Sequence, residues 1–198
     1  MSIEKLIPNK PKQKRSLERF QKILDTVEKI LIEDGVHAVT IQEISKLANM
    51  KRSSIYKLFP STGALFYGLS ERYLLHFNVL YRKNSEAVLI KEIDWYFDLF
   101  IDLLCIYLNQ NKARANLFFI LDSFPTSKTV DSQNKRLLAT NILEVLSKKE
   151  VVISAERVYI ASQLCLATLA IGFNEENCIS PRYVIEGKKA VKAYLAAN

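Results

Sequence analysis

The residues best suited to chemistry in this sequence lie in one short segment, from Arg52 to Lys57. Ile55 and Phe59 are spaced as i and i+4, so on a helix both point to the same side. If that side is a core, the outward residues are Arg52, Ser53, Tyr56 and Lys57. Two cations, a hydroxyl and a phenol suit phosphate oxygens and base edges. Taken alone, such a segment is more typical of an ordinary solvated helix face. Whether it is instead a DNA-contact surface depends on the elements that flank it.

Those elements are three helices in succession. Apolar spacing predicts a first helix of about 18 residues from Ser16, ending at Gly35. Thr40 to Glu43 forms a capping box that opens a second helix of about two turns. Asn49 tolerates the left-handed conformation of a tight turn, and a third short helix follows and closes at Pro60-Ser61. Two short helices joined by a tight turn fit the helix-turn-helix plan, in which the last helix enters the major groove of DNA.

The charge distribution supports this interpretation. The chain has 28 basic and 21 acidic side chains, a net charge of +7. Residues 1–59 hold 12 of the basic and 7 of the acidic ones, so most of the excess lies in under a third of the chain. An anionic partner is therefore expected. We predict a flexible basic arm over 1–15, a helix-turn-helix DNA-binding domain over 16–60, and a helical domain over 61–198.

Several other classes of protein are disfavoured. The chain has three cysteines, an odd number, and they are widely spaced: Cys105, Cys165 and Cys178. Neither a disulfide framework nor a zinc site is therefore expected. Neither histidine lies in a ligand or catalytic cluster and no glycine-rich nucleotide or nucleophile motif occurs, so no catalytic residue, metal or cofactor is predicted and the chain is expected not to be an enzyme. The longest uncharged run, Val158 to Asn174, is shorter than the ~20 residues that span a bilayer. We expect a cytoplasmic protein with no membrane segment.

The stretch from Ile23 to Leu69 resembles the TetR family of transcriptional repressors. The matching positions are Gly35, Thr40, Ala48-Asn49-Met50, Ile55-Tyr56 and Phe59-Pro60-Ser61. The resemblance implies that Thr40 and Tyr56 hold phosphates of a double-stranded DNA operator. It also implies that base or backbone contacts come from Gln42, Arg52, Ser53, Ser54 and Lys57.

The sequence departs from the family pattern at three places. Lys51 replaces a frequent capping serine and adds a charge that attracts phosphate. Leu58 replaces a frequent histidine or tyrosine, which removes one polar contact. Thr62-Gly63 replaces the usual Lys-Glu, so a hydroxyl and backbone amides must meet the phosphate there.

The rest of the chain has helical periodicity throughout, with no sign of strands, so the predicted fold class is all-α. We expect helices near 61–83, 90–110, 113–123, 129–149, 154–174 and 181–196. The resemblance implies that 61–198 is a ligand-binding and dimerisation domain, with a homodimer formed through the helices near 154–174 and 181–196. From the residues alone, the uncharged run fits the central helix of a monomeric domain equally well.

Aromatic residues gather in the middle helices and form candidate lining for an apolar ligand pocket: Trp95, Phe100, Tyr107, Phe118 and Phe119. Aromatics at helical spacing are more often plain core. The leading hypothesis is a dimeric repressor released from DNA by an unidentified, apolar small-molecule effector. The alternative is a helical binding module that uses its basic N-terminal part for an acidic protein or a membrane surface.

Overall fold

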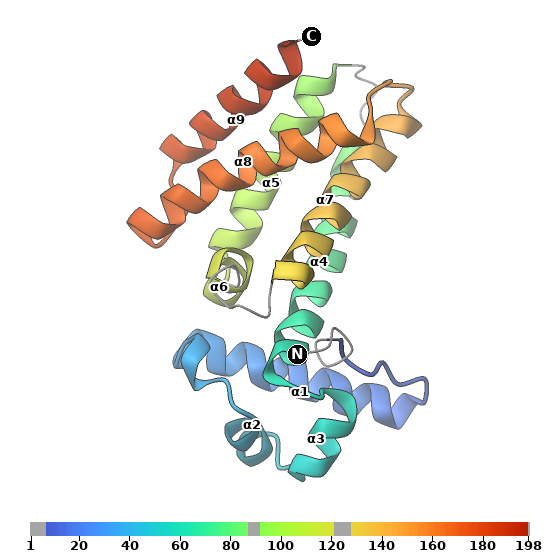
Figure 1. The fold of residues 1–198 in the computed structure, drawn as a ribbon, viewed down its shortest axis with the longest axis vertical. Coiled ribbons are helices and arrows are strands. Elements are labelled where there is room, and N and C mark those ends of the chain that lie inside the picture. The colour runs from blue at the N-terminus through green and yellow to red at the C-terminus, as the bar shows by residue number, and fades with distance from the viewer. Residues whose placement is uncertain (1–6, 87–91, 121–127, 198) are drawn as a thin grey trace. The chain divides into compact units, whose positions relative to one another are not determined.

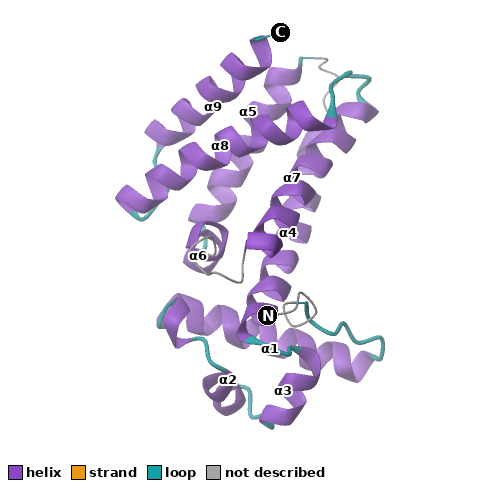
Figure 2. Ribbon diagram, viewed as in Figure 1, coloured by secondary structure: helices purple, strands orange, loops and turns teal. Residues whose placement is uncertain are grey.

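The computed structural model describes residues 7–86, 92–120 and 128–197, and their side chains except those of 120 and 128–134. These residues form α-helices and one short 3-10 helix, with no strand among them (Figures 1 and 2). The elements are α1 (Lys14–Glu33), η2 (Val36–Ala38), α2 (Ile41–Leu47), α3 (Arg52–Leu58), α4 (Thr62–Glu86), α5 (Ile93–Asn109), α6 (Lys112–Ile120), α7 (Lys128–Lys148), α8 (Ala155–Glu176) and α9 (Pro181–Ala196).

The all-α fold class predicted from the sequence is confirmed. Each predicted helix is present, and its described ends lie within three residues of the expected ones. The expected helix ends at 90–91 and 121–123 fall outside the described residues.

The chain divides into two compact units. Unit 1 comprises residues 1–73 and 111–131, and unit 2 comprises residues 74–110 and 132–198. Unit 1 therefore contains α1 to α3, the first part of α4, and α6. The domain boundaries drawn from the sequence, with one break after residue 60, stay a prediction.

The core of unit 1 explains why its short helices fold. α2 and α3 have seven residues each, too few to be stable alone, so they depend on packing against α1. α1 presents a fully buried stripe with helical spacing. The buried residues of α1 are Phe20, Ile23, Leu24, Val27, Ile30 and Leu31. Gly35 ends the helix region with φ of 81°, a conformation that favours glycine.

In unit 2, α8 and α9 lie side by side and antiparallel, joined by a short connection (Figure 1). Tyr183 of α9 packs on Gly172 of α8 so closely that a β-carbon at Gly172 would lie 2.5 Å from the tyrosine ring. α9 also packs on α5 through ion pairs, at 2.6 Å for Lys188 with Asp102 and 2.7 Å for Lys192. The partner of Lys192 is Asp98, so two carboxylates one helical turn apart on α5 hold α9.

α8 is long and apolar enough to cross a membrane by length and composition alone, yet it is built into unit 2. One side of it is buried, including Val158, Cys165 and Leu169. The opposite side is open within this single chain, unlike that of a central helix in a monomeric domain. Leu164 and Ile171 are 37% and 52% exposed.

Candidate nucleic-acid interface

The turn between α2 and α3 is held by local hydrogen bonds. The Glu43 backbone N–H donates to Thr40 Oγ1 at 3.1 Å, so Thr40 caps α2 as the sequence predicts. Asn49 has φ of 51°, the left-handed conformation expected there. The Ser45 hydroxyl donates to the Met50 carbonyl oxygen at 2.6 Å, and the Met50 N–H donates to the Ser45 carbonyl oxygen at 3.0 Å. These bonds fix the direction in which α3 leaves α2.

α3 has one buried side and one exposed side. Ile55 and Phe59 are fully buried, and the Phe59 ring stacks on Phe20 with 4.5 Å between centroids. Because these anchors face inward, the polar residues must face out. The exposed residues of α3 and its N-cap are Lys51, Arg52, Ser53, Tyr56 and Lys57.

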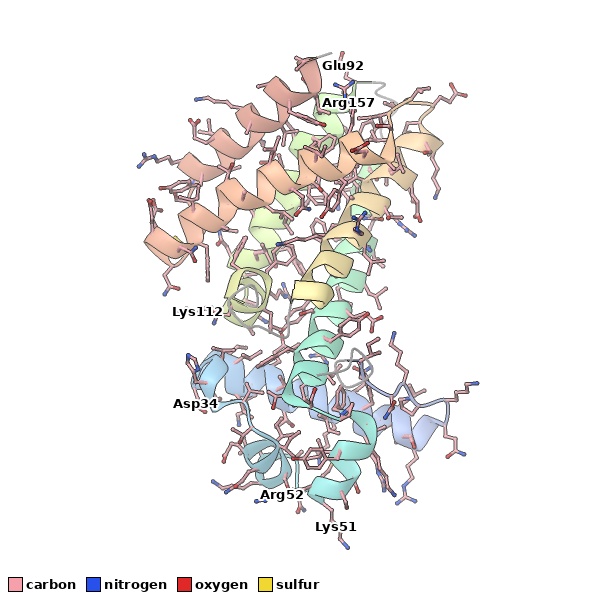
Figure 3. The ribbon with its side chains drawn as sticks, viewed as in Figure 1. Asp34, Lys51, Arg52, Glu92, Lys112 and Arg157 are labelled. Carbon is pink, nitrogen blue, oxygen red and sulfur yellow. The ribbon has the colours of Figure 1, made fainter. Side chains whose placement is uncertain are left out.

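The cations of this surface are available to a partner. Lys51 and Arg52 point away from the helices of unit 1 (Figure 3). Lys51, Arg52 and Lys57 form no ion pair with any described residue. Lys46 on α2 is by contrast 3.5 Å from the Glu43 carboxylate, which offsets its charge. Of the two helices that flank the turn, α3 therefore carries the unpaired positive charge, which attracts phosphate.

The other predicted contact residues flank this surface. Thr40 and Gln42 are exposed at the start of α2. Ser54 is half-buried on α3, and Thr62 is half-buried as the first residue of α4, next to the cap that Ser61 makes with the Ala64 N–H at 3.1 Å. The structure thus places all the predicted DNA-contact residues on α2, α3 and the start of α4. Their individual contacts with DNA stay predictions.

The sequence analysis did not predict the role of Asn9, which caps the C-terminal end of α3 through hydrogen bonds. Its backbone N–H donates to the Leu58 carbonyl oxygen at 2.7 Å, and its Nδ2 donates to the Lys57 carbonyl oxygen at 2.9 Å. Residues 48 positions apart make this contact, so no local pattern could reveal it. Residues 1–6 of the predicted flexible arm lie outside the described residues, whereas Pro8 is buried and α1 begins at Lys14.

The residues predicted to line a ligand pocket are divided between the two units. Phe100 and Tyr107 are buried in unit 2 around Phe77, with ring centroids 5.4 and 5.6 Å from it. Trp95 is half-buried in the same unit. Phe118 and Phe119 are half-buried on α6 in unit 1. Their role in ligand binding stays a prediction.

A short helix that presents free cations and hydroxyls, set by a tight turn and two buried anchors, defines a helix-turn-helix DNA-binding protein. No group of three His, Cys, Asp or Glu side chains close enough to hold a metal ion occurs among the residues that the structure describes.

Residues 23–68 match the family model described as "Bacterial regulatory proteins, tetR family". The matched segment contains the α2–α3 turn and the whole exposed surface of α3. Residues 23–68 are therefore a DNA-binding domain of the kind found in TetR-family transcriptional regulators. Regulators of this family are not enzymes. No curated protein matches the sequence.

Solved structures share the fold over almost the whole chain. A TetR transcriptional regulator from Rhodococcus sp. RHA1 is 15% identical with a TM-score of 0.74, covering 94% of this chain and 99% of its own. A TetR-family regulator from Streptomyces coelicolor is 17% identical with a TM-score of 0.67, covering 93% and 100%. The multidrug binding protein EbrR, complexed with imidazole, is 12% identical with a TM-score of 0.67, covering 89% of each chain.

Proposed function

We propose that this protein is a homodimeric repressor that binds a double-stranded operator through α3 and is released from it by a small molecule. The observation that carries the DNA-reading part is the exposed surface of α3. Its cations and hydroxyls lie directly opposite the buried anchors Ile55 and Phe59. In this role, phosphate contacts position the protein, and contacts to base edges select the sequence.

The roles of individual residues follow from their chemistry. Arg52 lies at the start of α3, where a guanidinium suits bidentate bonding to guanine. Tyr56 is 51% exposed and suits a phosphate or a thymine methyl group. Lys51 and Lys57 add phosphate attraction at the two ends of the helix. Thr40 and Thr62 offer hydroxyls to the backbone on either side.

A second copy of the chain accounts for the open side of α8. Ile160, Leu164, Ala167 and Ile171 are spaced as one helical stripe, and three of them are exposed in the single chain. Water-exposed stripes of this kind mark interfaces in soluble proteins. Covered by the same stripe and by α9 of a second copy, α8 becomes buried on both sides. The pair would then present two α3 helices to two half-sites about 34–36 Å apart.

Release by a small molecule is the third part of the proposal. A TetR-fold protein with a small molecule bound, EbrR with imidazole, is a structural relative. For the present chain the aromatic residues around Phe100 and Tyr107 supply apolar surroundings for such a molecule. The effector must bind more tightly, by about 1–3 kcal/mol, to a conformation in which the spacing of the two α3 helices does not fit the operator. Because the operator lies on the chromosome, the protein would act in the cytoplasm.

The experiment is selection of random duplexes by the purified protein. The proposal predicts an enriched inverted repeat whose half-site centres lie about one helical turn, or a whole multiple of turns, apart. Adding candidate apolar compounds to the enriched duplex should release the protein in at least one case. Enrichment of no motif would contradict sequence reading, and enrichment of a single half-site would contradict the dimer.

A further inference from the structure

Residues 7–13, which precede α1, lie against the end of α3 and the side of α4. Pro8 is buried, and a β-carbon added at Gly68 on α4 would lie 3.6 Å from the Pro8 ring. Lys10 Nζ is 2.5 Å from the Glu71 carboxylate, also on α4. Together with the two hydrogen bonds of Asn9, these contacts hold the first half of the segment, and its other end continues into α1.

This segment completes the helix that presents the DNA-contact residues. The last carbonyl groups of a helix have no partner within the helix. α3 has only seven residues, so a loose last turn would disturb much of it. Asn9 supplies donors to the carbonyls of Lys57 and Leu58, and it thereby fixes the end of α3 that carries Tyr56 and Lys57.

The same segment brings free cations to this end of α3. Lys12, Lys14 and Arg15 are exposed and form no ion pair with any described residue. Lys12 follows Asn9 by three residues, so their Cα atoms lie within about 11 Å of one another. Three like charges in four positions repel each other, and an anion placed among them would relieve that repulsion.

We propose that residues 7–15 form a second phosphate-binding element, which Asn9 seats on the end of α3 and which binds the operator backbone next to the groove that α3 enters. This inference rests on the proposed function. Its ligand is the phosphodiester backbone of duplex DNA, since the free cations continue the charged surface of α3. The element adds affinity and carries no sequence information of its own, because phosphates are the same in every duplex.

The test compares two triple variants of the full-length protein. One carries Lys12→Gln, Lys14→Gln and Arg15→Gln. The matched control carries Lys83→Gln, Arg136→Gln and Lys148→Gln, the same change in charge at exposed positions of unit 2. Binding to the selected operator and to a scrambled duplex is measured by fluorescence anisotropy between about 0.05 and 0.3 M salt, the range over which phosphate contacts are weakened.

The slope of log affinity against log salt should become shallower by about 0.9 for each phosphate that the protein no longer neutralises. The first variant should show this change on both duplexes, and the control should keep the wild-type slope. An unchanged slope in the first variant would overturn the inference. If the wild-type protein itself showed no preference for the operator, the proposed function would fail instead. The salt slope would still report whether residues 12–15 contact phosphates.

Asn9→Ala tests the seating of the element, since it removes the Nδ2 bond and keeps all three cations. It should weaken operator binding by about fivefold, the effect of losing one typical hydrogen bond. A melting temperature close to that of the wild type would show that the fold is intact. Wild-type affinity in this variant would overturn the role of Asn9. Unchanged DNA slopes together with lost binding to phosphatidylserine vesicles in the first triple variant would assign the cations to a membrane.

Discussion

Glu28 of α1 and Arg72 of α4 form an ion pair, with 2.7 Å between Oε2 and Nη2. The two side chains are only 24% and 15% exposed. The other carboxylate oxygen of Glu28 accepts hydrogen bonds from the Tyr73 hydroxyl and from Asn111 Nδ2, each at 2.8 Å. One carboxylate on α1 therefore holds α4 and the start of α6 within unit 1. Burial, and then the bond to Glu28, raise the pKa of the Tyr73 hydroxyl, so it remains a donor.

Replacing Glu28 should destabilise the protein strongly. Glu28→Ala removes three partners at once and leaves the Arg72 charge poorly compensated, so we expect a loss of roughly 2–4 kcal/mol in the free energy of unfolding. Asp25→Ala is the matched control, because Asp25 pairs with the same arginine but is 67% exposed. Its loss should stay below about 1 kcal/mol. Urea titrations followed by circular dichroism measure both, and equal losses would contradict the account.

Two glycines on the α8–α9 contact should respond in opposite ways. At Gly172 an added β-carbon would lie 2.5–2.9 Å from Tyr183, including its own β-carbon, so Gly172→Ala must push α9 away. We expect a loss of about 1–3 kcal/mol. At Gly187 the nearest atoms would be 3.8–3.9 Å away, and alanine favours a helix by up to about 1 kcal/mol. Gly187→Ala should therefore leave the melting temperature unchanged or raise it, and a large fall would be inconsistent with this packing.

Cys105 should make the protein less stable in alkali. Burial, and then the charge of Asp102, raise the pKa of its thiol from 9.0 to about 12. Between those two pH values the unfolded chain releases this proton and the folded chain keeps it, so stability is full below pH 9 and falls as pH rises. By pH 11 the loss in the free energy of unfolding is roughly 2–3 kcal/mol.

The control for this pH effect is internal to the chain. Cys105→Ala should lose less stability between pH 8.5 and 11 than the wild type, whereas a Cys178→Ala variant should follow the wild-type curve because Cys178 is exposed. Parallel curves for wild type and Cys105→Ala would argue against a buried neutral thiol at this position.

The exposed stripe of α8 predicts a dimer that a single charge disrupts. Ile171→Glu should convert the protein from twice the chain mass to the 22.7 kDa of one chain, because burying an unpaired carboxylate at the interface is costly. Val79→Glu is the control: Val79 is 68% exposed on α4 in the same unit, outside the stripe. Light scattering coupled to gel filtration measures both masses. A wild-type chain that is already monomeric would refute the dimer.

The sequence predicted those parts of the fold and interface that depend on local rules. The Thr40 cap, the left-handed Asn49 and the buried pair Ile55 and Phe59 each follow from the preference of one residue or from helical spacing. The outward set on α3 then follows from geometry alone. Lys51, which stands where a capping serine is frequent, forms no side-chain cap on α3.

Contacts distant in sequence could not be predicted in this way. The bond between Asn9 and the end of α3, and the Glu28 junction with Asn111, join residues that no periodicity relates. The pairing of α5 carboxylates with Lys188 and Lys192 required knowing that α9 lies against α5. Their i and i+4 spacing places Asp98 and Asp102 on one face of a helix but does not identify the helix that packs there. The sequence also left open what covers α8, because an uncharged helix must be covered but its composition does not say by which chain.

The central claim is that α3 reads DNA sequence, and fluorescence anisotropy tests it most directly. The purified protein is titrated against the DNA upstream of its own gene and against a scrambled duplex of equal length, at about 0.05 and 0.2 M salt. An Arg52→Ala variant is measured in parallel. Removing one bidentate bond to a base should cost roughly 1–3 kcal/mol on the native duplex and much less on the scrambled one.

We predict that the wild-type preference for the native duplex survives the higher salt and that Arg52→Ala reduces it. Equal binding to both duplexes, vanishing as salt rises, would contradict the account. In that case the surface of α3 would be a generic basic patch, and an acidic protein or a membrane surface would replace the operator as the partner.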